Sequence, residues 1–355
     1  MIDTERNRAA YVALVEVLNG RRALAFAGTG VVSSLGYPTW DGLITRLATE
    51  VRALRGEQVQ SNGVPITIDQ VLREFRDRPL VQAQILKENL GEQYFLLMAR
   101  LFGPIDRTAG SIADLVALPF KHLLTSNYDT SLESHHSQGI RPISICLHHP
   151  AAGQFITNFV DDNYGRRVVH VHGRFDEPKH IILTEEDYGR YVQSAVLEEF
   201  WRVVPAAGRL VFFGFGFQDL DILYTFRRRL MALGGNHNGN PRHFAIMPLS
   251  NPANDGTVTV RMRMQYGIEP VFFLHSGESF KEYDDLLSML KADVIGNVPA
   301  QVLAEAPHAE MVPVQQPEIA QPQEAAAPDA IQESVERLRE ITRANIAARK
   351  TGDLE

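Results

Sequence analysis

Apolar residues follow two alternating patterns along this chain. Short, mostly apolar runs of strand length occur at residues 23–27, 122–125, 168–171, 210–213, 243–246 and 270–273. Between many of these runs, apolar residues recur at the spacing of an amphipathic helix. Strands that alternate with helices favour a parallel sheet covered by helices on both faces. We therefore expect an α/β, Rossmann-like fold.

One large domain, residues 1–292, accounts for these patterns. It includes a helical insertion at about 41–118, where apolar positions keep helical spacing, and it closes with a helix at 278–291. Thr184 is followed three residues later by Asp187, a capping-box pattern that predicts the start of a helix.

The remainder of the chain has a different composition. Residues 293–330 are rich in Pro, Ala, Gln and Glu, which bury too little apolar area to offset chain entropy, so we interpret them as a flexible linker. Residues 331–350 then carry one apolar stripe on a charged amphipathic helix. A single apolar stripe needs a partner, and we expect a homo-oligomer or docking on another protein.

Composition and charge exclude several functions. The net charge of −8 and the lack of a long basic run argue against direct nucleic-acid binding. No apolar run reaches the roughly 18 residues of a membrane span, and the N-terminus lacks the layout of a signal peptide, so we expect a cytoplasmic protein without membrane contact. The single cysteine, Cys146, cannot form an internal disulfide or a four-cysteine zinc site.

Two glycine-containing turns follow predicted strands. Gly28-Thr29-Gly30 comes after the run at 23–27, and Gly214-Phe215-Gly216 comes after the run at 210–213. Glycines at such a turn let the phosphates of a dinucleotide approach backbone N–H groups. Ser33 stands where the dinucleotide fingerprint has its third glycine, so the first turn is equally compatible with a tight corner that binds nothing.

Polar side chains follow two further runs. Asn127 and Asp129 come after residues 122–125, and His172 comes near the end of the run at 168–171. Ligands of open parallel sheets bind outside the carboxyl ends of the strands, so these residues would face the crevice. His172 is a candidate general base, because the pKa of an unperturbed imidazole lies near neutrality.

Each of these residues also has a structural interpretation. Asn127 and Asp129 are of types that form turns and helix caps. His172 shares a strand face with His170, so the two are also compatible with core histidines or with a metal chelate, although no third ligand stands at convincing spacing. The aspartates nearest to completing such a chelate are Asp161, Asp162 and Asp176.

Taken in order, these segments resemble the sirtuin family, and more narrowly the divergent sirtuin-like proteins of bacterial antiphage defence. The resemblance spans roughly residues 20–290. Thr29 and Val32 depart from the family, which places Ala and Ser there. The segments that carry the resemblance are Ala27 to Trp40, Thr125 to Asp129, His172-Gly173, Ile182-Leu183-Thr184 with Asp187-Tyr188, and Phe213 to Asp219 with Asp221.

The resemblance implies that NAD is bound as a substrate and that its nicotinamide–ribose bond is cleaved. Asn127 and His172 would be catalytic, the first orienting water or ribose and the second acting as base. Asp129 would hold the nicotinamide carboxamide. The cofactor-binding residues implied in addition to Asn127 and Asp129 are Gly28, Thr29 and Gly30 at the diphosphate, and Gly214 and Phe215 near the adenosine.

The resemblance also leaves alternatives open. Lysine-deacylating sirtuins carry a four-cysteine zinc module, which one cysteine cannot build, so NAD hydrolysis without zinc is favoured over protein deacylation. A regulatory module that binds NAD or ADP-ribose without turnover is a second alternative. The defence branch further implies an effector that depletes NAD after a phage signal, as an oligomer or with a partner such as an ATPase or an Argonaute-like protein.

Overall fold

The computed structural model describes residues 1–105, 110–135, 143–147, 149, 152–161, 165–217, 243–275 and 281–296. They belong to a compact unit that comprises Met1–Ala309. The predicted C-terminal helix and nearly all of the predicted linker lie outside the described residues.

Within the described part of the chain, a seven-stranded sheet has the order β5-β6-β4-β1-β7-β8-β9. Its neighbouring strands all pair in parallel, which confirms the expected α/β, Rossmann-like fold. The strands are β1 (Ala23–Ala27), β4 (His122–Thr125), β5 (Ile143–Cys146), β6 (Arg167–His170), β7 (Arg209–Phe213), β8 (His243–Leu249) and β9 (Ile268–Leu274).

The six apolar runs all form strands of this sheet, but the edge strand β5 was not predicted. Its sequence, Ile-Ser-Ile-Cys, is short and only partly apolar, so it gives a weak strand signal. The predicted insertion also contains an unexpected hairpin, β2 (Gln58–Ser61) with β3 (Val64–Thr67). Asn62 and Gly63 at its turn both have positive φ, as a tight hairpin turn requires.

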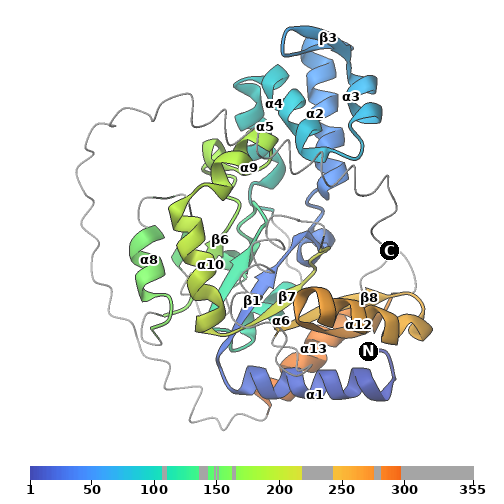
Figure 1. The fold of residues 1–355 in the computed structure, drawn as a ribbon, viewed down its shortest axis with the longest axis vertical. Helices are drawn as coiled ribbons and strands as arrows, with labels where there is room; N and C mark the ends of the chain where they lie inside the picture. The colour runs from blue at the N-terminus through green and yellow to red at the C-terminus, as the bar shows by residue number, and fades with distance from the viewer. Residues whose placement is uncertain are drawn as a thin grey trace. The chain divides into compact units, whose positions relative to one another are not determined.

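Helices cover both faces of the sheet, because successive strand residues point to opposite sides. Ala25 belongs to one apolar core, whereas its neighbours Leu24 and Phe26 belong to the other. The first core includes α1 (Glu5–Asn19), α6 (Gly110–Ala117) and α13 (Lys281–Ile295); the second includes α8 (Ala152–Asn158), α9 (Glu185–Val192), α10 (Ala195–Ala207) and α12 (Asp255–Tyr266). Figure 1 shows α8 and α10 on one side of the central strands and α1 and α13 on the other.

The helical insertion, drawn in blue and cyan in Figure 1, lies at one end of the Met1–Ala309 unit. Its α4 contacts α9, which follows β6 in the chain, and Lys87 of α4 forms an ion pair with Asp187 of α9. The insertion therefore contacts a helix that flanks the carboxyl end of the sheet. Its helices are α2 (Trp40–Arg55), α3 (Ile68–Glu74), α4 (Pro79–Leu90) and α5 (Gln93–Phe102).

Candidate active site

Strand register brings the predicted site residues to one edge of the sheet. Ala27 of β1 pairs with Thr125 of β4 and with Phe213 of β7. Thr125 in turn pairs with His170 of β6. Four neighbouring strands therefore end level with one another, and the segments that leave them begin side by side.

The order of connections places a crevice at this edge. The chain runs from β1 to β4, which lies on one side of β1. It later crosses from β6 to β7, which lies on the other side of β1. In open α/β sheets, ligands bind where the connections diverge in this way, outside the carboxyl ends of the strands. The ends of β4, β1 and β7 meet this condition.

The glycines after β1 allow two backbones to touch. A Cβ atom on Gly28 would lie 2.7 Å from the carbonyl oxygen of Gly214, and one on Gly30 would lie 2.8 Å from the Cα atom of Gly214. The amides of Gly28 and Gly30 donate to the carbonyl oxygens of Phe213 and Gly214, each at 2.9 Å. These amides are thus engaged within the protein, and Thr29 between them is the exposed residue of the loop.

Asn127 is held by its own backbone and by its side chain. Its backbone N–H donates to the Thr125 hydroxyl at 3.0 Å, and its Nδ2 donates to the carbonyl oxygen of Gly28 at 3.1 Å. The residue is only 5% exposed, and its Oδ1 has no hydrogen-bond partner among the described residues. A buried polar atom without a protein partner is uncommon and often has a functional role.

Asp129 is also buried, but its carboxylate has a local partner. Oδ1 accepts a hydrogen bond from the backbone N–H of Ser131 at 2.9 Å, as in a turn that starts the short helix α7 (Ser131–Ser134). Burial raises the pKa of the Asp129 carboxyl, although the hydrogen bonds from Ser131 act in the opposite direction. The turn-forming interpretation of Asp129 is therefore correct, and a nicotinamide contact would be an additional role.

His172 lies two residues beyond the end of β6, as Asn127 does beyond β4. Its ring packs edge to face against Tyr188 and Tyr191 of α9, at centroid distances of 5.4 and 5.6 Å. Gly173 follows with φ +85°, and a Cβ atom there would lie 2.5 Å from the carbonyl oxygen of His180. Glycine at this position lets the chain turn sharply away from the strand directly after His172.

His170 does not share the surroundings of His172, contrary to the alternation expected from the sequence. Its Nδ1 lies 3.1 Å from the carbonyl oxygen of Asn127, and its Nε2 lies 2.8 Å from Oε1 of Glu133 in α7. The alternation stops because β6 ends at His170. Since both ring nitrogens of His170 have partners, a metal chelate of the two histidines is disfavoured.

Glu133 completes a buried polar cluster behind Asn127. Its Oε1 also accepts a hydrogen bond from the Ser144 hydroxyl of β5 at 2.8 Å. Burial by itself would raise the pKa of the Glu133 carboxyl, but the hydrogen bond and charge of His170 outweigh it, and the net pKa is lowered. His170, Glu133 and Ser144 were not predicted as site residues, because α7 and β5 have weak sequence signals.

Asp187 connects the capping box of α9 to the insertion. Thr184 and Asp187 exchange the predicted reciprocal hydrogen bonds, and Lys87 donates to both Asp187 oxygens at 2.9 Å. Burial works to raise the pKa of Asp187, yet the hydrogen bond and charge of Lys87, together with the hydrogen bonds from Thr184, outweigh it and the pKa is lowered. Since α9 also carries the two tyrosines that pack on His172, the insertion is linked indirectly to the predicted base.

Gly214 and Phe215 lie directly beyond β7, as predicted. Gly214 has φ +55°, and a Cβ atom there would lie 2.4 Å from the backbone nitrogen of Val31. Phe215 is half-buried and packs against Phe26 and Phe217, at centroid distances of 5.2 and 5.1 Å. The sequence places Asp219 and Asp221 next, but both lie outside the described residues.

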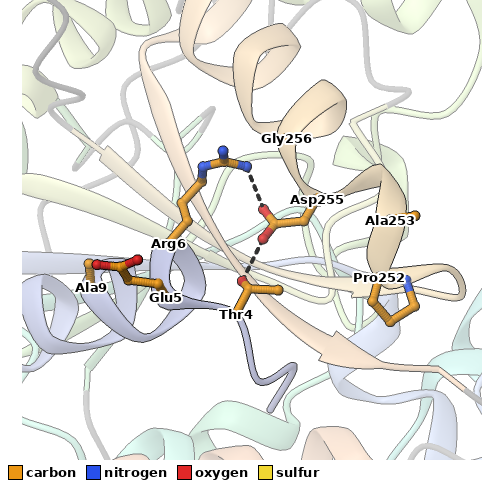
Figure 2. Close-up of a pocket in the computed structure, with 8 residues that line it drawn as sticks. All are labelled: Thr4, Glu5, Arg6, Ala9, Pro252, Ala253, Asp255 and Gly256. Atoms are coloured by element: carbon orange, nitrogen blue, oxygen red, sulfur yellow. Dashed lines mark hydrogen bonds and ion pairs between the residues drawn. The ribbon is translucent and has the colours of Figure 1, made fainter.

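A separate pocket lies between α1 and α12 (Figure 2). Asp255 accepts hydrogen bonds from Thr4 at 2.5 Å and from Arg6 at 3.3 Å, so its carboxylate is already engaged. None of the predicted site residues lines this pocket. Its lining residues are Thr4, Glu5, Arg6, Ala9, Pro252, Ala253, Asp255 and Gly256.

None of the helices in the described ranges combines the length and the hydrophobicity that a membrane span requires. Within the same ranges, no group of three or more His, Cys, Asp and Glu side chains is arranged to hold a metal ion.

Comparisons with known proteins agree with the motifs. Residues 121–271, which include Asn127, Asp129 and His172, match the model of the SIR2-like domain. The chain is 24% identical over 212 residues to the NAD(+) hydrolase ThsA of Enterococcus faecium, and the match covers 58% of this chain and 40% of that protein. The ordered motifs and the parallel sheet agree with this match, and the chain contains a SIR2-like domain.

Proposed function

We propose that this protein hydrolyses NAD+ to nicotinamide and ADP-ribose. The observation that carries the proposal is the Asn127 side chain, whose Nδ2 is fixed on Gly28 while its Oδ1 has no partner among the described residues. An oxygen oriented in this way can accept a hydrogen bond from water or from a ribose hydroxyl. The SIR2-like domain match and the likeness to an NAD(+) hydrolase support NAD as the substrate.

The chemistry suits a site made of an amide and an imidazole. The bond between ribose C1′ and the nicotinamide nitrogen breaks, and its electron pair neutralises the pyridinium, so the leaving group needs no acid. Positive charge develops on the ribose, and water adds to C1′ and loses a proton. Asn127 would orient the water or ribose, and His172 would take the proton.

The other residues would bind the rest of the dinucleotide. Asp129 would contact the nicotinamide carboxamide, and Gly214 and Phe215 would lie near the adenosine. Because the amides of Gly28 and Gly30 already donate to backbone carbonyls, we assign the diphosphate contact of that loop chiefly to Thr29. Gly28 and Gly30 contribute by letting the loop pack on Gly214.

Release of nicotinamide from NAD+ by the purified full chain tests this proposal. Asn127→Ala and His172→Ala should each abolish release while circular dichroism and the unfolding midpoint remain close to those of the wild type. Ser134→Ala, a change in the short helix beyond Asp129, serves as a matched control and should retain activity. Full activity in both Asn127→Ala and His172→Ala would refute the assignment.

A second candidate, NAD or ADP-ribose binding without turnover, is favoured by the burial of the site. Asn127 and His172 are only 5% and 3% exposed, so water and substrate reach them only if the site opens. Isothermal titration with NAD distinguishes the two functions. Binding without nicotinamide release, with and without candidate partners, would favour the regulatory module.

The biological setting is part of the same proposal. A defence effector that depletes NAD must stay inactive until it is triggered, and an oligomer or a partner such as an ATPase or an Argonaute-like protein would provide that control. Light scattering of the full chain and of residues 1–299 tests whether the C-terminal segment supports assembly. If both proteins form particles with the same number of chain copies, that role is contradicted.

A further inference from the structure

We propose that His170, held by Glu133, is a positioning residue that fixes Asn127 for catalysis. The inference rests on the proposed function, since it assigns a task to the neighbours of a proposed catalytic amide. It starts from the four polar atoms of Asn127. Three of them, the backbone nitrogen, the backbone oxygen and Nδ2, have protein partners in Thr125, His170 and Gly28. Only Oδ1 is left to act on a ligand.

The direction of each hydrogen bond follows from the partner atoms. A backbone carbonyl can only accept, so the Nδ1 atom of His170 must carry a proton and donate it to Asn127. Nε2 faces a carboxylate oxygen at 2.8 Å, and that contact is favourable only if a proton lies between the two atoms. The pair is therefore either an imidazolium with a carboxylate or a neutral ring with a carboxylic acid, and in both forms Nδ1 keeps its proton and donates to Asn127.

Burial makes this arrangement rigid. His170 is 0% exposed and Glu133 is 7% exposed, so water does not compete readily for either ring nitrogen. The cluster joins the end of β6 to α7 and β5, through His170, Glu133 and Ser144. A hydrogen bond in such a low-dielectric setting is strengthened, and the loss of one partner is correspondingly costly.

Three variants separate positioning from packing. Glu133→Gln can place its amide nitrogen where Oε1 lies, so that it donates both to Nε2 of His170 and to the Ser144 hydroxyl oxygen, and the Nδ1 bond to Asn127 survives. Glu133→Leu leaves Nε2 of His170 without a partner, so the ring is held only by its bond to Asn127. His170→Phe combined with Glu133→Leu replaces both partners by apolar groups, which avoids an unpaired buried carboxylate and favours folding.

His122 provides a matched control for the buried histidine. It is 1% exposed, its Nε2 bonds to the carbonyl oxygen of Phe159, and its Nδ1 accepts from the backbone of Arg167. It begins β4, whereas Asn127 follows the end of the same strand. His122→Phe therefore removes a comparable pair of hydrogen bonds far from the proposed reaction.

Steady-state kinetics of NAD cleavage by the full chain give the first readout. In Glu133→Leu and in the double variant, kcat should fall about 10- to 100-fold while KM changes less than about threefold, as expected when a positioned group shifts by a fraction of an ångström. Glu133→Gln should stay within about threefold of the wild type. His122→Phe should lose stability but keep its kcat.

Hydrogen exchange of the Asn127 side-chain amide, followed by NMR on Asn-labelled protein, gives a readout that needs no activity. Exchange should accelerate at least tenfold in the double variant and remain near the wild-type rate in Glu133→Gln and His122→Phe. Unchanged exchange together with unchanged kcat in the double variant would overturn the inference. If the wild type cleaves no NAD, the proposed function fails, and exchange at Asn127 alone decides whether His170 holds it.

Discussion

Asn127 donates a hydrogen bond from Nδ2 to the carbonyl oxygen of Gly28, 3.1 Å away, and so joins the end of β4 to the loop after β1. The two residues are separated by 99 positions in the sequence. The bond fixes which side-chain atom of Asn127 faces the protein. It also makes the position of the glycine loop important for the proposed reaction, because a shift of Gly28 would rotate the carboxamide.

The glycine loop gives a first prediction. Gly28→Ala places a Cβ atom 2.7 Å from the Gly214 oxygen, a backbone atom that cannot move aside cheaply. We expect a loss of about 1–3 kcal/mol in the free energy of unfolding and a large fall in NAD cleavage. Urea unfolding and nicotinamide release measure the two effects.

Gly153→Ala is the control for this change. Gly153 lies in α8, and a Cβ atom there meets nothing within 4 Å. Alanine is the better helix former, so the free energy of unfolding should stay the same or rise by up to about 1 kcal/mol. Equal stability of Gly28→Ala and the wild type would contradict the close contact with Gly214.

The ion pair between Lys87 and Asp187 gives a second prediction. Lys87→Met leaves a carboxylate that is 3% exposed without its main cation, although Arg190 still donates to it. We expect the free energy of unfolding to fall by about 3 kcal/mol, which is at the lower end of the range for a broken buried ion pair. The variant Lys87→Met with Asp187→Asn should recover most of it, because the amide keeps the Thr184 cap without a charge.

The pH dependence of this pair has a definite sign. Lys87 lowers the pKa of Asp187 in the folded state, so the pair stabilises the protein above the pKa of the unfolded chain, and that contribution disappears as the pH falls. Unfolding free energies measured from pH 7 to pH 3 should therefore decline less steeply in Lys87→Met than in the wild type. Parallel curves would argue against the ion pair.

His122 gives a third prediction. Burial lowers the pKa of its imidazole to about 4, from 6.5, because the folded state admits the charged form poorly. Stability should therefore be complete above about pH 6.5 and should decrease by up to about 3 kcal/mol as the pH falls toward 4. His122→Gln should lack this part of the decline, whereas a change at the exposed His180 should leave it intact.

Asp129 gives a fourth prediction. Asp129→Asn keeps an oxygen that can accept from Ser131, so the turn before α7 should persist and the unfolding midpoint should change little. If the carboxyl group contacts nicotinamide, KM for NAD should rise about tenfold or more, as for the loss of one hydrogen bond to a charged group. Asp285→Asn, an exposed change in α13, should leave KM unaltered.

Local features of the sequence predicted much of the fold. The run Ala23 to Ala27 is 0–1% exposed along its whole length, and a run of that kind has few alternatives to a central strand. Thr184 and Asp187 form the expected capping box, because its hydrogen bonds join residues three positions apart. The edge strand β5 and the β2–β3 hairpin were missed, although Asn62-Gly63 is a hairpin signal in its own right.

The candidate site was likewise predictable from the sequence only in part. Asn127, Asp129 and His172 could be selected from sequence, since polar residues that follow apolar strands stand out. The partners of these residues could not. From the sequence alone, Glu133 and Ser144 resemble ordinary surface residues. Lys87 is 100 positions away from its partner Asp187.

The sequence by itself determined six strands of the sheet, most of the helices beside them and which polar residues follow the strands, because these properties depend on neighbours a few positions away. The tertiary structure decided which of those residues meet. It alone placed Asn127 against Gly28, turned His170 toward Glu133 and tied α4 to α9. Such contacts arise from strand order, register and packing, which bring distant segments together, and no local pattern encodes them.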